Sequence, residues 1–456
     1  MKKILIILGV LVLIGVIALA VFLATFDVDR YRPMVVKQIS TAIGRPVRLE
    51  HISLAWHDGV SLELKNLAVE PDSAGTEPPA QVENVHLVVR LLPLLKRNIQ
   101  VASVSVVRPR LHVERGADGL IKVEGLYPLP SKPASAAQPA GATPSASTAL
   151  PLLISMVQIE DGTIRVNDKS TQPPLDLTIQ EINVDLRNIS LLPPGSVQLK
   201  RFSAKLAGGT VTADGTIQNL FTKPEVAFQA QAQNLALENL VPASNPSEPT
   251  LRGNFSGSFQ GKFQGTAWPE ISNTLSGQGR VSLTNGAIVN MNILREIFQR
   301  ISIIPGLAEN LAANLPASYQ EKFNAKDTLL QPIDFPMAVE RGAVSFNNIR
   351  VATDTFELNG SGRLGLDCSL SMQSRVTVEP QLSAAMLQSV KELQILADSQ
   401  GRVEIPVLLQ GTLPKIRVMP DISSVASRLT TTKAEELIGG LLEKMIEKRK
   451  KKSSGD

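Results

Sequence analysis

A strict alternation of phenylalanine and glycine narrows the possible folds of this chain more than any other feature. In GNFSGSFQGKFQG, residues 253–265, the odd positions hold only Gly and Phe, and the even positions are mostly polar. A period of two places successive side chains on opposite faces of an extended chain. The stretch therefore predicts a β-strand, or a hairpin of two short strands, with one wet face and one face made of Phe255, Phe259, Phe263 and the glycines between them.

A strand face of Phe and Gly has two explanations, because buried strand faces usually carry Val, Ile and Leu instead. The glycines can mark bulges or bends in a closed sandwich, where a Phe on a facing strand covers each one. Alternatively, the glycines let the sheet curve, and the widely spaced rings leave an open apolar groove for acyl chains. The alternation by itself is compatible with both structures.

A second alternation runs through FELNGSGRLGLDCSLSM, where residues 356–372 place every even-numbered, mostly apolar position on one face. From this run we take Phe356, Leu358, Leu364 and Leu366 as further candidates for the lining of a groove. The run contains G-x-G-x-x-G, but a dinucleotide site requires a helix directly after the glycines. Here the strand pattern continues, so we do not interpret the motif as a nucleotide site. Elsewhere, GRVSLTNGAIV predicts a strand followed by a turn at Asn285-Gly286.

Composition favours a mostly β protein with a few helices, because 31 Gly and 30 Pro accompany many short alternating runs. The formal charge of +4 is small for 456 residues and argues against a nucleic-acid partner. The single cysteine, Cys368, excludes a disulfide within the chain.

The N-terminus carries the strongest targeting signal. After Lys2 and Lys3, residues 4–24 form an uncharged apolar run. At ~1.5 Å per residue such a run spans ~31 Å, the thickness of a bilayer core. We expect an uncleaved single-pass anchor with its N-terminus in the cytoplasm and the bulk of the chain outside it. The alternative is a cleaved signal peptide, since residues 18–20 resemble a cleavage site.

Five segments follow from these patterns. Residues 1–25 are the anchor, and 26–130 are a β region whose leading helix ends at Gly44. Residues 131–151 are rich in Pro, Ala and Ser, and we expect a disordered, dispensable linker or loop within one sheet. Residues 152–432 are a longer β region with inserted helices near 293–301 and 382–393, and 433–456 are an amphipathic helix with a basic tail.

No motif in the sequence calls for catalysis. The four histidines lack metal-ligand spacing, and there is neither a P-loop nor a G-x-S-x-G elbow. We therefore predict a protein that is not an enzyme, with no metal and no cofactor. The basic tail has three explanations: a solvated end, contact with anionic headgroups, or a partner-binding helix. Its candidate membrane-surface residues are Lys448, Arg449, Lys450, Lys451 and Lys452.

The order of several motifs resembles the AsmA-like family of envelope proteins over nearly the whole chain. FDVDRYRPMVVKQISTAIGRPVRL resembles its opening after the anchor, and VVRPRLHVERGADG resembles its R-P-x strand with a D-G turn. LSGQGRVSLTNGAI, VERGAVSFNNIRVATDTFELNGSGRLGL and IPVLLQGTLPKIRVMPD resemble its C-terminal domain.

The resemblance implies an inner-membrane protein of a Gram-negative envelope, with its bulk in the periplasm. It implies a long curved β-sheet whose apolar groove holds phospholipid acyl chains, and a role in phospholipid transport or outer-membrane biogenesis and integrity. An outer-membrane or other envelope protein is a further possible partner. The alternative function is an assembly factor that binds client outer-membrane proteins by strand addition at its sheet edges, without carrying lipid.

Overall fold

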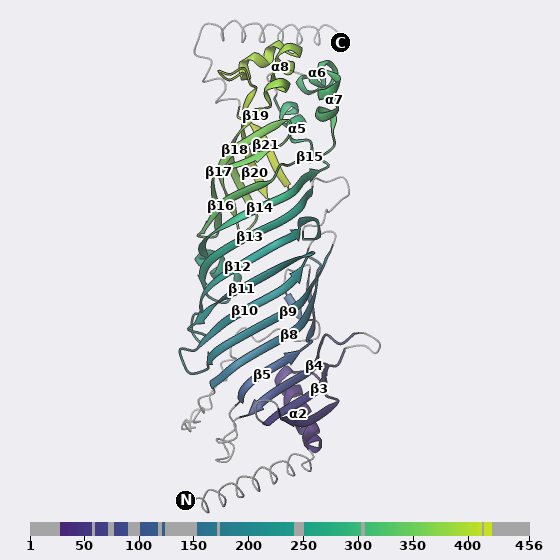
Figure 1. The fold of residues 1–456 in the computed structure, drawn as a ribbon, viewed down its shortest axis with the longest axis vertical. Coiled ribbons are helices and arrows are strands. Elements are labelled where there is room, and N and C mark those ends of the chain that lie inside the picture. Colours follow the sequence, from purple (N-terminus) through teal and green to yellow (C-terminus); the bar gives the residue numbers. More distant parts are fainter. Residues whose placement is uncertain are drawn as a thin grey trace, which may run out of the picture. The chain divides into compact units, whose positions relative to one another are not determined.

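The computed structural model describes residues 28–56, 60–71, 77–89, 101–116, 121–123, 153–170, 174–240, 250–301, 306–412 and 415–421. The mostly β prediction is confirmed, since strands dominate these residues and helices are few (Figure 1). The chain divides into two compact units, unit 1 up to Phe228 and unit 2 from Gln229. No helix among the described residues is long and apolar enough to cross a membrane. The predicted anchor at 4–24 and the segment 433–456, with its basic run 448–452, lie outside the described residues.

Unit 1 is a sheet with a short helical start. Its elements are η1 (Asp29–Tyr31), α2 (Arg32–Ile43), β1 (Val47–Arg48), β2 (His51–Trp56), β3 (Val60–Val69), β4 (Ala80–Val89), β5 (Val101–Val107), β6 (Arg110–Arg115), β7 (Ile121–Val123), β8 (Leu153–Asp168), β9 (Leu175–Ser190), β10 (Ser196–Leu206) and β11 (Gly209–Gln218). The predicted leading helix is confirmed: Pro33 stands in its first turn, and Gly44, with a φ of 77°, ends it. The division between the units falls within β12 (Glu225–Ala236).

The strands of unit 1 pair mostly antiparallel, with one change of direction. β3 pairs with β1, β2 and β4, β4 with β5, and β9 with β8 and β10. β8 runs parallel to β5 and β6, with Val104 opposite Val157 and Leu111 opposite Ile164. The predicted Pro/Ala/Ser segment at 131–151 lies outside the described residues, between β7 and β8 in the chain.

Unit 2 is an antiparallel sheet with inserted helices. It contains η2 (Leu237–Asn239), β13 (Thr250–Gln264), α4 (Trp268–Thr274), β14 (Ser276–Val289), α5 (Ile293–Gln299), α6 (Leu307–Asn314), α7 (Ala317–Asn324), β15 (Thr328–Leu329), β16 (Ile333–Glu340), β17 (Ala343–Ala352), β18 (Phe356–Gly365), β19 (Ser369–Val378), α8 (Pro380–Ser389), η3 (Lys391–Leu396), β20 (Glu404–Thr412) and β21 (Lys415–Pro420). β13 pairs with β14, β14 with β16, and each strand from β16 to β20 with the next along the chain. The helices predicted near 293–301 and 382–393 are confirmed as α5 and as α8 with η3.

Two of the predicted strand boundaries in unit 2 are wrong. Asn285-Gly286 is not a turn but a bulge inside β14: these two residues face the single Gly253 of β13, and Asn285 has a φ of 53°. The run 356–372 is not one strand but a hairpin, β18 and β19, that turns at residues 366–368. The predicted common face nevertheless survives, because Leu364 pairs with Leu370 and Gly362 with Met372.

Helices cover part of each sheet. In unit 1, Val35 and Val36 of α2 pack against a small core of Leu49, Ile52 and Leu64. In unit 2, α5, α6, α7 and α8 gather at one end of the strands (Figure 1). Phe298 and Leu311 from these helices are almost fully buried against Val376 and Ile405 of the sheet. We call this cluster the helix-capped core.

Candidate functional site

One face of the unit 2 sheet is apolar across eight strands. The register carries it from strand to strand, since residues opposite each other in a sheet share a face. One row crosses all eight: Gly261, Gly277, Val339, Val344, Leu364, Leu370, Gly411 and Ile416. A neighbouring row contains Phe259, Gly279 and Met337, and the next contains Gly257, Val281 and Phe335. The apolar surface is therefore continuous over the strands of unit 2.

The other face of the same strands is polar. Ser258, Arg280 and Pro336 form one row, and Gln260, Gln278 and Ala338 form the next. From Asn254 to Gln264 the alternation lies in a single strand, β13, with the predicted polar and apolar faces, whereas Gly253 lies in a bulge and Gly265 follows the strand. Of the two structures that the sequence allowed for this stretch, one strand or a hairpin, the single strand is present.

The glycines of this face lie beneath phenylalanine rings of the same sheet. A Cβ at Gly261 would lie 2.4 Å from Cε1 of Phe259, and one at Gly277 would lie 2.7 Å from Cζ of the same ring. At Gly279 the nearest ring atom, Cδ2 of Phe259, would be 3.1 Å away. Backbone carbonyl oxygens of β13 would be closer still, Gln260 at 2.3 Å from a Cβ at Gly277 and Ser258 at 2.2 Å from one at Gly279. The ring and the neighbouring backbone together therefore leave little room for side chains at these glycines, and Cζ of Phe255 would lie 3.3 Å from a Cβ at Gly257. We call Phe255, Gly257, Phe259, Gly261, Gly277 and Gly279 the Phe/Gly patch.

The Phe/Gly patch lies apart from the helix-capped core. Phe255, Phe259 and Phe263 are half-buried, and none of them belongs to that core. Met337 and Leu364 are likewise half-buried. The rings lie over the glycines, and the glycines have no side chains. Few atoms therefore project from this part of the apolar face.

The seven candidate groove residues fall into different surroundings. Phe356 and Leu358 are 3% and 6% exposed and lie inside the helix-capped core, and Leu364 packs at its margin. Leu366 lies in the β18–β19 turn, where its backbone N–H donates to the carbonyl of Gly342 at 2.8 Å. Phe255, Phe259 and Phe263 share β13, and Phe356, Leu358 and Leu364 share β18. Contact of any of the seven with lipid stays a prediction.

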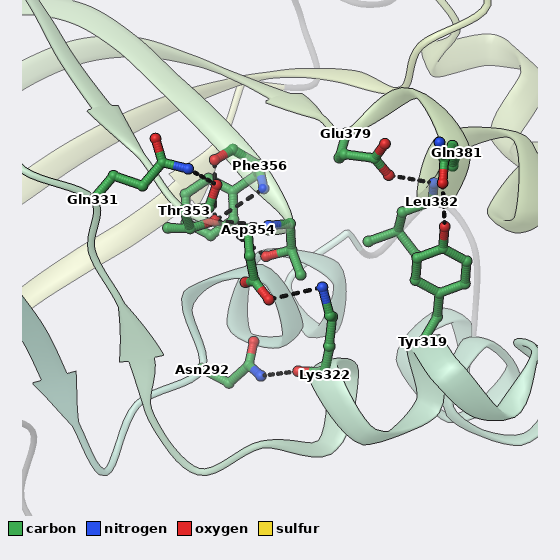
Figure 2. A network of polar contacts seen from close by, with 11 residues as sticks. Asn292, Tyr319, Lys322, Gln331, Thr353, Asp354, Phe356, Glu379, Gln381 and Leu382 are labelled. Carbon is green, nitrogen blue, oxygen red and sulfur yellow. Dashed lines mark hydrogen bonds and ion pairs between the residues drawn. The ribbon is translucent and has the colours of Figure 1, made fainter.

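Polar contacts hold the capping helices in place (Figure 2). Nζ of Lys322 in α7 lies 2.8 Å from a carboxylate oxygen of Asp354, in the loop between β17 and β18. The hydroxyl of Tyr319 donates to Gln381 of α8 at 3.3 Å. These contacts join α7 to the β17–β18 loop and to α8.

Unit 1 has an apolar face of its own, which the sequence reading did not identify. One row runs through Leu64, Val85, Val106, Ile159, Val184, Phe202 and Ala213. A second runs through Leu62, Leu87, Val104, Val157, Leu186, Leu199 and Gly215. The signal was present as period-two alternation in each strand, but only the register shows that the strands share a face. The same holds for Phe335, Met337 and Val339 in unit 2.

The polar face of the unit 2 sheet also carries paired charged side chains. A cavity of about 1160 Å³ is lined there by Arg350, Glu357, Arg375 and Glu404. Arg350 donates to Glu357 at 2.6 Å, and this contact, together with a bond from Asn359, lowers the pKa of the Glu357 carboxyl. Among the described residues, no three His, Cys, Asp or Glu side chains stand close enough to hold a metal ion. The predictions of no metal, no cofactor and no catalysis stay predictions.

The comparisons with known proteins agree with the order of motifs in the chain. The model of the AsmA family matches residues 1–193 and 176–349. The chain is also 22% identical over 236 residues to Protein AsmA of Escherichia coli (strain K12), an alignment that covers 48% of this chain and 36% of that protein. The chain thus aligns with little more than a third of the length of this relative. Since the family model covers well over half of the residues, the chain belongs to the AsmA family.

Proposed function

We propose that the apolar faces of both units bind acyl chains of phospholipids, and that the protein supports phospholipid transport or outer-membrane integrity. The observation that carries this proposal is the continuity of the apolar rows through the register of neighbouring strands. Contiguous apolar surface of this extent is unusual unless it binds a partner or a ligand. The low relief of the Phe/Gly patch suits a flexible chain that lies along the sheet, and membership of the AsmA family agrees with an envelope role.

The proposal includes the location of the protein. Residues 4–24 would anchor it in the inner membrane with the bulk in the periplasm, as their length and the preceding lysines favour. We propose that the protein holds lipid without chemical change to it, as a non-enzymatic carrier.

Lipid extraction and cross-linking test the proposal. The full-length protein is purified in mild detergent, and co-purified lipid is identified by mass spectrometry. A phospholipid with a photoreactive group in its acyl chain is then expected to label Phe255, Phe259 and Met337, and to spare Ser258 and Gln260 on the polar face. Equal labelling of both faces, or no bound phospholipid, would contradict the proposal.

A pair of aspartate variants provides the matched control. Phe259→Asp places a charge on the apolar face and is expected to reduce bound lipid strongly, because an apolar ligand cannot solvate it. Ser258→Asp places the same charge one residue away on the exposed polar face, and bound lipid should stay unchanged. Thermal unfolding of both variants confirms that they are folded.

One observation favours the alternative function. Among the described residues, β21 pairs with one strand, β20, and such an edge strand is the kind of element to which a client strand can be added. A client protein bound there would cross-link to residues 415–420 and would leave acyl-chain labelling of the apolar face unaffected.

A further inference from the structure

A cavity of about 610 Å³ opens on the polar side of unit 1, close to the first residue that the structure describes. Its lining includes four arginines, Arg32, Arg48, Arg108 and Arg110, but only two carboxylates, Glu50 and Glu83. The cavity therefore carries an excess of two positive charges. Such a charged hollow attracts anions more strongly than isolated surface arginines do.

The sheet register brings two of these arginines to one row. Arg48 of β1 lies opposite Ala68 of β3, Ala68 lies opposite Gln81 of β4, and Gln81 lies opposite Arg110 of β6. Three strand spacings separate the two arginines, about 14 Å between their backbones. Ala68 and Gln81 lie between them in the row. Because Ala68 is small, the long side chains of Arg48 and Arg110 can both reach one anion bound above it.

Arg48 and Arg110 have no ion-pair partner among the residues that the structure describes. Arg108 donates to the carboxylate of Glu83, and Arg32 donates to the backbone carbonyl of Glu50 and lies 3.9 Å from Asp29. For Arg48 and Arg110, the described residues provide neither an ion pair nor a side-chain hydrogen bond. Their planar guanidinium groups, each with several N–H donors, match the geometry of a phosphate group.

We propose that this cavity binds the phosphate of a phospholipid headgroup in the membrane leaflet next to the predicted anchor. Arg32 follows the apolar run 4–24 by about eight residues, so it lies at most ~28 Å from the end of that run. This reach is short enough to bring the cavity to the membrane surface, where lipid headgroups carry phosphate. This inference rests on the proposed anchoring and lipid binding, and it adds a polar contact site, separate from the apolar faces, that holds unit 1 at the membrane.

Cross-linking with a headgroup probe tests the inference. The full-length protein in non-ionic detergent is exposed to a phosphatidylglycerol analogue with a photoreactive headgroup, and labelled peptides are identified by mass spectrometry. We expect labels near Arg48, Asn66 and Gln81. Arg48→Gln together with Arg110→Gln should reduce this labelling by about ten-fold, since two charge-assisted contacts are lost.

The matched control removes two positive charges elsewhere in unit 1. Lys200→Gln together with Lys223→Gln changes two exposed cations outside the cavity and should leave the labelling unchanged. Equal loss in both double variants, or no loss in the arginine variant, would overturn the inference. Thermal unfolding shows that both double variants are folded.

Two further measurements are made. The first distinguishes a lipid headgroup from free phosphate, and the second distinguishes failure of the headgroup inference from failure of the proposed acyl-chain binding. Unlabelled short-chain phosphatidylglycerol should compete with the probe, whereas inorganic phosphate should compete far more weakly. Equal competition would assign the cavity to a free phosphate and would overturn the lipid assignment. Labelling of Phe259 by the phospholipid with a photoreactive acyl chain is measured in the same sample. If this phospholipid labels the apolar face while headgroup probes miss the cavity, the headgroup inference fails and the proposed function stands.

Discussion

Phe259 explains how one strand can alternate its largest flat side chain with no side chain at all. Its ring lies where the side chains of Gly261, Gly277 and Gly279 would be, on its own strand and on the neighbouring one. At Gly277 and Gly279 the backbone carbonyls of Gln260 and Ser258 would be closer to an added Cβ than the ring is, so ring and backbone together favour glycine, and the ring covers backbone that glycine leaves bare. The sequence reading considered coverage by a Phe on a facing strand, but the covering ring belongs to the same sheet.

The loss of unfolding free energy in Phe259→Ala shows how far the Phe/Gly patch is exposed. We expect Phe259→Ala to lower the free energy of unfolding by only ~1–2 kcal/mol, because a half-buried ring loses less contact than a core ring. The matched variant is Phe298→Ala in the helix-capped core, where the ring is 1% exposed and the loss should reach ~3–5 kcal/mol. Denaturant unfolding compares them, and equal losses would indicate that the Phe/Gly patch is a closed core.

Asp398 ties the end of η3 to the start of β20 and should make stability depend on pH. The backbone N–H of Arg402, the backbone N–H of Gln400 and the Arg402 guanidinium all donate to its carboxylate, and they lower its pKa. A group whose pKa is lowered in the folded state stabilises it above the unfolded pKa, about 3.9 for Asp, and loses this effect as the pH falls further.

Melting curves at several pH values test this role. Asp398→Asn should lower the melting temperature at pH 7, and its difference from the unmodified protein should shrink below a pH of about 4. Asp214→Asn, at an exposed site in β11, is the control and should match the unmodified protein throughout. A deficit of Asp398→Asn that is constant with pH would mean that the charge of Asp398 contributes nothing.

Most strands and helices can be predicted from the sequence, but the bulges and hairpin turns within the strand runs cannot. Period-two alternation identified β13, and apolar periodicity identified α5 and α8. Bulges such as Asn285-Gly286 escaped because an Asn-Gly pair is also the commonest hairpin turn, and the choice depends on the partner strand. The hairpin of β18 and β19 escaped because its three-residue turn preserves the period of two.

The candidate site was predictable only strand by strand. Phe255, Phe259 and Phe263 stand out in the sequence, whereas Val339 and Leu364 join the same face only through long-range pairing. Phe356 and Leu358 follow the same alternation and yet lie under helices. No local pattern distinguishes a covered from an uncovered part of one face.

Asn292 joins two helices of the cap, and its two amide atoms have separate roles. Its Oδ1 accepts from the backbone N–H of Arg295 and caps α5, at 3.0 Å. Its Nδ2 donates to the carbonyls of Lys322, Phe323 and Ala325 at the end of α7, and Figure 2 shows it beside Lys322. One side chain thus satisfies backbone groups at the start of one helix and at the end of another.

Two substitutions at Asn292 separate these roles. Asn292→Ala should lower the free energy of unfolding by ~2–3 kcal/mol, because it removes the cap and the side-chain donor to the carbonyls of Phe323 and Ala325. Asn292→Asp keeps the capping oxygen but turns a second oxygen toward three carbonyls, so it should be no more stable than Asn292→Ala. Chemical unfolding measures both, and full recovery in Asn292→Asp would show that the contact with α7 is unimportant.

At the scale of the molecule, both units follow one plan. Each has a sheet with a continuous apolar face, and in each, helices cover only part of that face. In unit 1 the plan depends on β8, which runs parallel to β5 and β6 and pairs with β9 on its other side. Parallel neighbours require a long connection. The Pro/Ala/Ser stretch at 131–151 supplies it, which gives that stretch a role through its length rather than its composition.

The register sets how short this connection can be. Val113 of β6 lies opposite both Val123 of β7 and Val166 of β8, and β8 begins at Leu153, ~43 Å along the strand from Val166. Deletion of 131–149 would leave about eleven residue steps from Val123 to Leu153, which reach at most ~38 Å. Deletion of 137–146 would leave about twenty steps, which reach ~70 Å.

We therefore expect the two deletions to differ, which refines the expectation that the stretch is dispensable. The shorter deletion should leave the melting temperature unchanged, and the longer one should lower it, because the chain must pull β7 or the start of β8 out of register. Replacement of 131–149 by a Gly/Ser sequence of equal length keeps the reach and should behave like the unmodified protein. Destabilisation by that replacement would mean that the stretch packs against the sheet. A longer deletion as stable as the unmodified protein would contradict the pairing of β8 with β6.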